Sequence, residues 1–194
     1  MGIGAVKRRA VFLDRDGVLN RNYLWPDGKT HPPVSLAEVE LLSGVAQACD
    51  VLRAAGYLLI VVTNQPDVAR GTQEQSVVEA INRSLRDQLA LDAFYVCYHD
   101  NRDGCGCRKP QPGLLLQAAE QWGIDLHASF MVGDRMTDVE AGRRAGCRAI
   151  LISEGDLASQ DEESPDFCAT ALHTAVGWIL GQHEHTLNEE QFQR

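Results

Sequence analysis

The sequence predicts an α/β protein built on a Rossmann-like, doubly wound and mainly parallel sheet. Apolar runs alternate along the chain with segments in which apolar residues recur at helical spacing. The run Tyr57 to Val62 is apolar at every position, which is typical of a strand that helices cover on both faces. Acidic and polar residues directly follow several of the runs, at the strand ends where such sheets bind ligands.

Each predicted element has its own signal. Gly56 stops a helical pattern, Pro112 opens one, and Gly133-Asp134 ends an apolar run. The segment Asn22 to Pro33 contains three prolines and Gly28, and predicts an irregular loop. These signals place strands at 10–13, 57–62, 93–98, 129–132 and 148–152, and helices at 41–55, 73–91, 113–122 and 138–145.

Length and composition predict one globular domain. The chain has 194 residues, 44% of them hydrophobic, and we expect a single domain over 1–180 followed by a polar tail at 181–194, with an acidic solvated loop at 154–166. The net charge of -9 disfavours nucleic-acid and anionic-membrane partners. No signal-peptide pattern is visible and the apolar runs are too short to span a membrane, which predicts a cytoplasmic monomer.

The first strand leads into an acidic cluster, Asp14-Arg-Asp16-Gly17. One carboxylate can attack phosphorus while the second serves the leaving oxygen as general acid and base, provided that a divalent cation neutralises their repulsion. Gly17 permits the tight turn that brings backbone amides toward a phosphate. The alternative is a surface turn with two solvated aspartates, and the cluster alone does not decide between them.

Three further segments make the cluster specific. Thr63 follows the second strand, Lys109 lies in Arg108-Lys109-Pro110, and Asp134 follows the strand at 129–132. Together with Asp14-Arg-Asp16-Gly17-Val18, this order resembles the haloacid dehalogenase superfamily over about the first 150 residues. The resemblance implies the haloacid dehalogenase fold with little or no cap domain.

The resemblance also implies roles for these residues. Asp14 would be the nucleophile and Asp16 the general acid and base, with Thr63 and Lys109 binding the phosphoryl oxygens. Mg²⁺ would be held by Asp14, by the backbone carbonyl of Asp16 and by Asp134. Asp138 is left open, as a neighbour of the metal site or as a helix-start residue without metal contact.

A second cluster holds three thiols and one imidazole within eleven residues: Cys97, His99, Cys105 and Cys107. Four nitrogen and sulfur ligands satisfy tetrahedral Zn²⁺, and a complete set indicates a structural site. A redox pair is the alternative, although a Cys-x-Cys pair suits a disulfide poorly. Because Arg108 and Lys109 directly follow the last ligand, a zinc loop at 97–107 would fix both cations over the phosphate.

The zinc loop narrows the resemblance to the D-glycero-D-manno-heptose-1,7-bisphosphate phosphatases and the histidinol-phosphatases. Three segments resemble the heptose enzymes: 13–17, 62–65 with 69–71, and 107–113. Pro66-Asp67, the short zinc loop and the 22–33 loop depart from their pattern and place the substrate in question. The resemblance implies that substrate would be contacted by Asn20, Asn22, Thr63, Asn64, Gln65, Arg108, Lys109 and Arg135.

The hypothesis from sequence is therefore an Mg²⁺-dependent phosphatase acting on a small phosphorylated metabolite, best a heptose 1,7-bisphosphate, through an aspartyl phosphate. Arg108 and Arg135 could recognise a second phosphate. The rival substrate is histidinol phosphate. A non-catalytic, zinc-stabilised binding module is a rival of another class, and a phosphoryl transferase is a third. His31 and Trp25 carry no partner pattern and are assigned no role.

Overall fold

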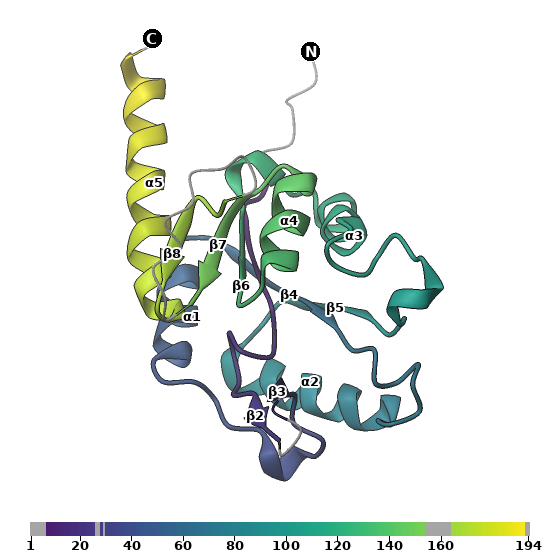
Figure 1. The fold of residues 1–194 in the computed structure, drawn as a ribbon. Helices are drawn as coiled ribbons and strands as arrows, with labels where there is room; N and C mark the ends of the chain where they lie inside the picture. The colour runs from purple at the N-terminus through teal and green to yellow at the C-terminus, as the bar shows by residue number, and fades with distance from the viewer. Residues whose placement is uncertain (1–6, 26–27, 29, 154–163, 193–194) are drawn as a thin grey trace.

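The structure is a computed structural model that describes residues 7–25, 28, 30–153 and 164–192, the last ten of them as backbone alone. Its centre is a six-stranded, fully parallel sheet in the order β5-β4-β1-β6-β7-β8 (Figure 1). The predicted parallel α/β architecture is therefore confirmed. The strands are β1 (Ala10–Leu13), β4 (Leu58–Asn64), β5 (Ala93–Cys97), β6 (Phe130–Gly133), β7 (Arg148–Ile152) and β8 (Phe167–Ala169).

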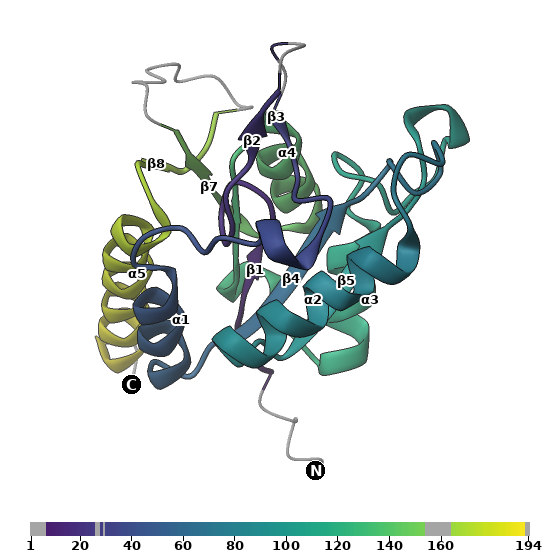
Figure 2. The ribbon, with the colours of Figure 1, turned by 90° about the horizontal axis from the view of Figure 1, so that it is seen from below.

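Helices cover both faces of the sheet (Figure 2). One core cluster joins α1 (Val45–Ala54), α2 (Gln75–Leu89) and α5 (Leu172–Phe192) to side chains of β1 and β4 such as Leu13 and Val61. The other joins α3 (Gly113–Trp122) and α4 (Met136–Ala145) to the alternate side chains, such as Phe12 and Val62. Neighbouring strand residues thus serve opposite cores, which explains why the strands are apolar at every position.

The structure contains elements that the sequence did not predict. The 22–33 segment, expected to be irregular, holds a two-stranded hairpin, β2 (Tyr23–Leu24) and β3 (Thr30–His31). Strand β8 and the long helix α5 were also missed. Helix α5 continues to Phe192, so most of the polar 181–194 segment is helical. The acidic loop predicted at 154–166 lies largely outside the described residues.

Between β1 and α1, the described residues form only this hairpin and one turn of 3-10 helix, Leu36–Glu38. This agrees with the expectation of little or no cap domain. Among the described helices, none combines the length and apolar character that crossing a membrane requires.

The register of the sheet brings the chemically suggestive residues to one edge. Leu13 pairs with Val61 on one side and with Val132 on the other, and Asn64 pairs with Cys97. The carboxyl ends of β1, β4, β5 and β6 therefore lie next to one another, and the polar residues that follow each strand converge there.

Candidate active site

Lys109 lies at the centre of the converging residues. Its Nζ donates to Asp14 Oδ1 at 2.7 Å and to the Val62 carbonyl at 2.8 Å, and lies 2.6 Å from Asp138 Oδ1. The residue is only 4% exposed. Burial opposes its charge, but Asp138 and Asp14 outweigh that effect and raise the pKa of Lys109. Asp14 is thus held beside a cation that stays protonated.

Three carboxylates form a compact oxygen cluster: Asp14, Asp134 and Asp138 each present an oxygen within 4.8 Å of the others. Burial, together with the neighbouring carboxylates, raises the pKa of Asp14 to about 7, although Lys109 acts in the opposite direction. Burial and then Asp138 raise the pKa of Asp134 to about 6. Lys109 and Arg135, whose Nε lies 3.9 Å from Asp134 Oδ1, oppose these shifts, but the pKa values of Asp14 and Asp134 remain raised.

The cluster fits a hard divalent cation. Asp134 Oδ1 is buried and has no hydrogen-bond partner among the described residues, which suits an oxygen that serves as a metal ligand. Two glycines make room for the aspartate side chains. A Cβ on Gly17 would lie 2.2 Å from Asp134 Oδ2, and a Cβ on Gly133 would lie 2.1 Å from Asp138 Cβ. Gly17 also has φ +92°, which favours glycine.

Asp138 belongs to this site in two ways. Its Oδ2 accepts a hydrogen bond from the Arg135 amide at 3.0 Å, so it does cap the start of α4. Its Oδ1 forms an ion pair with Lys109 Nζ, so that Asp138 is the second carboxylate, after Asp14, that contacts this lysine. The two roles that the sequence left open for Asp138 are therefore both compatible with its position.

Asp16 is held by a set of donors next to Asp14. Its carboxylate accepts from Arg15 Nε at 3.0 and 3.1 Å, from Asn20 Nδ2 at 2.9 Å and from Gln65 Nε2 at 2.8 Å. Gln65 also donates to Thr63 Oγ1 at 2.9 Å. These donors fix the direction of a side chain that lines the cleft.

Two of the predicted substrate contacts do not fit this arrangement. Asn20 is fully buried and Gln65 is 3% exposed, and neither is among the described residues that line the cleft. Their amide groups are used on Asp16, so their place in the site is to support this carboxylate. The motif that contains them predicted their proximity to the substrate, but it did not distinguish a contact from a support.

Thr63 and Asn64 reach the cleft from the end of β4. Asn64 bonds both backbone groups of Lys109: its Nδ2 donates to the Lys109 carbonyl and its Oδ1 accepts from the Lys109 amide, each at 3.1 Å. This double contact positions Lys109 directly from the sheet. The predicted neighbourhood of Thr63, Asn64 and Lys109 is therefore present.

A cleft of about 670 Å³ opens over this edge of the sheet. The predicted residues Asn22, Arg108 and Arg135 line it, together with residues that the sequence did not promote: Thr30, His31, Asp67, Arg70, Asn101 and Met136. His31 stacks on Trp25 with ring centroids 4.1 Å apart. Arg70 pairs with Asp67 and Asp100, whereas the acceptors that the described residues offer to Arg108 are neutral.

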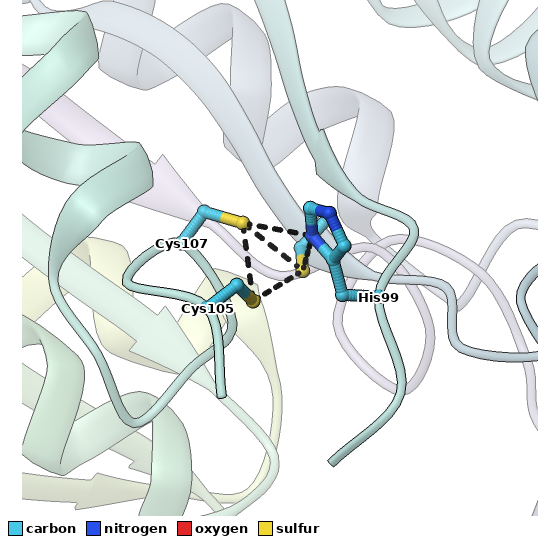
Figure 3. A group of neighbouring side chains, drawn as sticks. His99, Cys105 and Cys107 are labelled. Carbon is cyan, nitrogen blue, oxygen red and sulfur yellow. Dashed lines mark hydrogen bonds between the residues drawn. The ribbon is translucent and has the colours of Figure 1, made fainter. Parts of the chain in front are cut away.

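The four predicted zinc ligands converge, and Figure 3 shows three of them, His99, Cys105 and Cys107, pointing toward one another. The sulfur of Cys107 lies 3.3 Å from that of Cys97 and 3.4 Å from that of Cys105, and His99 Nδ1 lies 3.3 Å from it. A tetrahedral Zn²⁺ bound at about 2.3 Å would separate its sulfur ligands by roughly 3.8 Å. The set therefore has close to the size that such an ion requires.

The zinc loop also positions Arg108. Its Nε donates to Asn101 Oδ1 at 2.6 Å and its Nη1 donates to the His99 carbonyl at 3.3 Å. Both acceptors belong to the loop between the metal ligands, so the direction of Arg108 depends on the loop. Lys109, one residue later, is held instead by Asn64.

Comparison with known proteins gives one consistent result. Residues 106–176 match the HAD-hydrolase-like family model. D-glycero-beta-D-manno-heptose-1,7-bisphosphate 7-phosphatase of Pasteurella multocida is 37% identical over 166 residues, which cover 79% of this chain and 86% of the relative. D-glycero-D-manno-heptose-1,7-bisphosphate 7-phosphatase of Thermosynechococcus vestitus is 37% identical over 194 residues, covering 89% and 95%.

The solved structures agree with these relatives. The crystal structure of D,D-heptose 1,7-bisphosphate phosphatase from B. bronchiseptica, complexed with magnesium and phosphate, has a TM-score of 0.74 to this chain. It is 29% identical, and the match covers 90% of this chain and 99% of that one. A putative HAD-like phosphatase from Mesorhizobium loti is 30% identical with a TM-score of 0.72, covering 89% and 86%.

Proposed function

Because this chain belongs to the D-glycero-D-manno-heptose-1,7-bisphosphate 7-phosphatase family of HAD-like hydrolases, we propose that it hydrolyses the 7-phosphate of such a heptose bisphosphate. One observation carries the chemistry: Asp14, Lys109 and the oriented Asp16 line one cleft, and Asp134 presents an oxygen within 4.8 Å of Asp14. This is the set of groups that phosphoryl transfer to a carboxylate needs.

In the proposed reaction, a carboxylate oxygen of Asp14 attacks phosphorus and the bond to the sugar oxygen breaks. Asp16 gives its proton to that leaving oxygen, then takes a proton from the water that hydrolyses the aspartyl phosphate. Lys109 and the Thr63 hydroxyl bind phosphoryl oxygens throughout. Water attack returns Asp14 to its free form and releases inorganic phosphate.

Mg²⁺ is the proposed cofactor, and Asp14, Asp134 and the Asp16 backbone carbonyl would hold it. It would supply charge neutralisation between the nucleophile and the phosphoryl group. The carboxylate cluster and the buried, unpaired Asp134 oxygen support this assignment. Zn²⁺ is proposed as a structural ion at the cluster of Cys97, His99, Cys105 and Cys107, supported by the spacing of their ligand atoms.

The second phosphate of the substrate would bind at the rim of the cleft. The acceptors that the described residues offer to Arg108 there are neutral, and the Arg135 side chain is 62% exposed and 3.9 Å from its nearest carboxylate oxygen. Both guanidinium groups are therefore available to an anion. Asn22, Asn64 and the hairpin residues Thr30 and His31 line the space between the rim and Asp14.

We also propose that the protein is active as a monomer. A cytoplasmic location is proposed with it. Size-exclusion chromatography of the active protein tests the first of these proposals. Activity that appears only in a dimeric fraction would contradict it.

Phosphate release with Mg²⁺ tests the function directly. The panel contains both anomers of the heptose 1,7-bisphosphate, histidinol phosphate and several hexose phosphates, with Asp14→Asn as the inactive control. We expect the highest kcat/KM for one heptose anomer and none for the control. A preference for histidinol phosphate would replace the substrate, and near-normal turnover by Asp14→Asn would overturn the mechanism.

A further inference from the structure

Arg15 is a fully buried cation that the proposed reaction does not use. It lies between Asp14 and Asp16 in the chain, yet its side chain turns away from the cleft and has no exposed surface. A buried guanidinium is costly unless its N–H groups find acceptors. What holds Arg15 is therefore informative about what Arg15 does.

Two residues hold this guanidinium. On one side, Nε donates to both carboxylate oxygens of Asp16 at 3.0 and 3.1 Å, and Nη2 lies 2.9 Å from Asp16 Oδ2 as an ion pair without a hydrogen bond. On the other side, Nη1 donates to Asn82 Oδ1 at 3.0 Å. Asn82 is the only acceptor outside the Asp16 carboxylate that the described part of the chain gives to Arg15. It is 7% exposed on the inner face of α2, 67 residues away in sequence.

We propose that Asn82 is a positioning residue for catalysis, acting through Arg15 on Asp16. This inference rests on the proposed function, since it assigns a support to its general acid and base. The chain of contacts runs from α2 through Asn82 and Arg15 to Asp16, and each link is a direct polar contact between buried or nearly buried groups. Without Asn82, Arg15 Nη1 would be a buried donor without an acceptor, and the guanidinium would shift away from Asp16.

Asp14 and Lys109 are held by contacts that involve neither Asn82 nor the Arg15 side chain. Asp14 is held by Lys109, and Lys109 by Asn64 and the Val62 carbonyl. Loss of Asn82 should therefore leave the nucleophile and the phosphoryl-binding groups in place, and impair only proton transfer by Asp16. That makes the consequence dependent on the leaving group, because p-nitrophenolate leaves without a proton whereas a sugar alkoxide needs one from Asp16.

The test compares Asn82→Leu, which removes the acceptor at similar volume, with Asn82→Asp, which keeps an acceptor oxygen. For each, kcat/KM is measured with the heptose bisphosphate and with p-nitrophenyl phosphate. We expect Asn82→Leu to lower kcat/KM for the sugar phosphate by roughly tenfold to a hundredfold, and for p-nitrophenyl phosphate by less than about threefold. Asn82→Asp should stay close to the wild type in the ratio of the two.

Leu85→Ala, on the same helix and in the core, is the matched structural control. It should lower the melting temperature without changing the ratio of the two substrates. Asp16→Ala should show the same preference for p-nitrophenyl phosphate more strongly, and adding Asn82→Leu to it should cause no further loss, because both substitutions remove one function.

The outcomes separate the inference from the proposed function. A wild-type protein without activity on any phosphate ester would overturn the function. An active wild type with an unchanged substrate ratio in folded Asn82→Leu, or an additive loss in the double variant, would overturn the role of Asn82. If Asn82→Leu does not fold, the same measurements are made on Asn82→Ala, and an unchanged ratio there overturns it equally.

Discussion

Asp134 keeps one carboxylate oxygen buried without a hydrogen-bond partner among the described residues, and burial raises its pKa to about 6. A raised carboxylate pKa means that the folded protein holds its proton more tightly than the unfolded chain, whose ordinary value is 3.8. The stability that this proton gives is present at low pH and is lost as the pH rises through about 6. At pH 8 the ionised Asp134 therefore destabilises the metal-free protein.

The first prediction concerns Asp134→Asn. Because the amide removes the buried charge, we expect the metal-free variant to be more stable than the wild type at pH 8 by about 1–3 kcal/mol, and the difference to shrink as the pH falls from about 6 toward the ordinary carboxylate pKa of 3.8. Urea unfolding in buffer that contains EDTA measures the difference in the free energy of unfolding. Mg²⁺ should stabilise the wild type at pH 8 but not the variant. Equal stability of both proteins at pH 8 would contradict the account.

Sequence reasoning at the residue scale located the groups that carry the chemistry but not all that support them. Asp14, Asp16 and Asp134 were identifiable because each follows a predicted strand end within a recognisable motif, and Lys109 because it directly follows the cysteine cluster. Asn82 had no such signal, since it lies mid-helix and its partner is 67 residues away. The pairing of Arg15 with Asp16 could have been expected, because a cation that lies between two aspartates in sequence is close to both carboxylates.

Among the elements, the zinc loop can be tested most directly, by removing the metal ion that it is proposed to bind. Two of its three cysteines, Cys105 and Cys107, are partly exposed, whereas Cys97, Cys49 and Cys147 are buried. Burial raises the pKa of Cys49 to about 11 and those of Cys97 and Cys147 to about 12, so these three should not react in the folded protein. Cys168 is half-buried on β8. The reactive thiol count of the folded protein therefore reports on the loop.

The second prediction is that metal removal frees two reactive thiols. With Zn²⁺ bound, we expect only Cys168 to react readily with a thiol reagent at pH 8. After chelation, two more should react, Cys105 and Cys107, and denaturation should raise the count to six. Metal analysis should find one Zn²⁺ per chain lost in parallel. Three fast thiols before chelation would mean that the cluster does not bind metal.

The third prediction separates the two cations that follow the loop. Arg108 is held by Asn101 and by the His99 carbonyl within the loop, but Lys109 is held by Asn64 from β4. Zn²⁺ removal should therefore raise KM for the bisphosphate several-fold while kcat changes less. Arg108→Ala should reproduce this effect in the zinc-bound protein. A loss confined to kcat would show that the loop acts on Lys109 instead.

The strands that the sequence missed share a physical reason. Strands β2 and β3 are two residues each and β8 is three, too short to show a period of alternation. Their pairing comes from tertiary contact, as Ile150 pairs with Phe167 across the last strand pair. By contrast, β7 and α3 were predicted with their observed bounds, because each is a clear run between strong stop and start residues.

At the scale of the whole molecule, α5 closes one face of the sheet. Its buried residues Leu172, Ala175, Val176 and Ile179 join the core beside α1, and Trp178 stacks on Phe167 of β8. Gln182 accepts a hydrogen bond from Arg148 at 2.7 Å. These named contacts of α5 lie at or before Gln182. The predicted boundary near 180 stays a prediction, and the backbone continues as helix to Phe192.

The fourth prediction tests this boundary. A chain that ends at Gln182 should fold, keep wild-type kcat and KM, and melt within about 2 °C of the full chain, because it keeps every core contact of α5 made by the side chains that the structure describes. Full-length Ile179→Ala is the contrasting variant and should lose about 2–5 kcal/mol by opening a cavity between α5 and the sheet. If the shortened chain unfolds or loses activity while Ile179→Ala is tolerated, then 183–194 belongs to the folded domain, and the domain must be extended to the end of the helix.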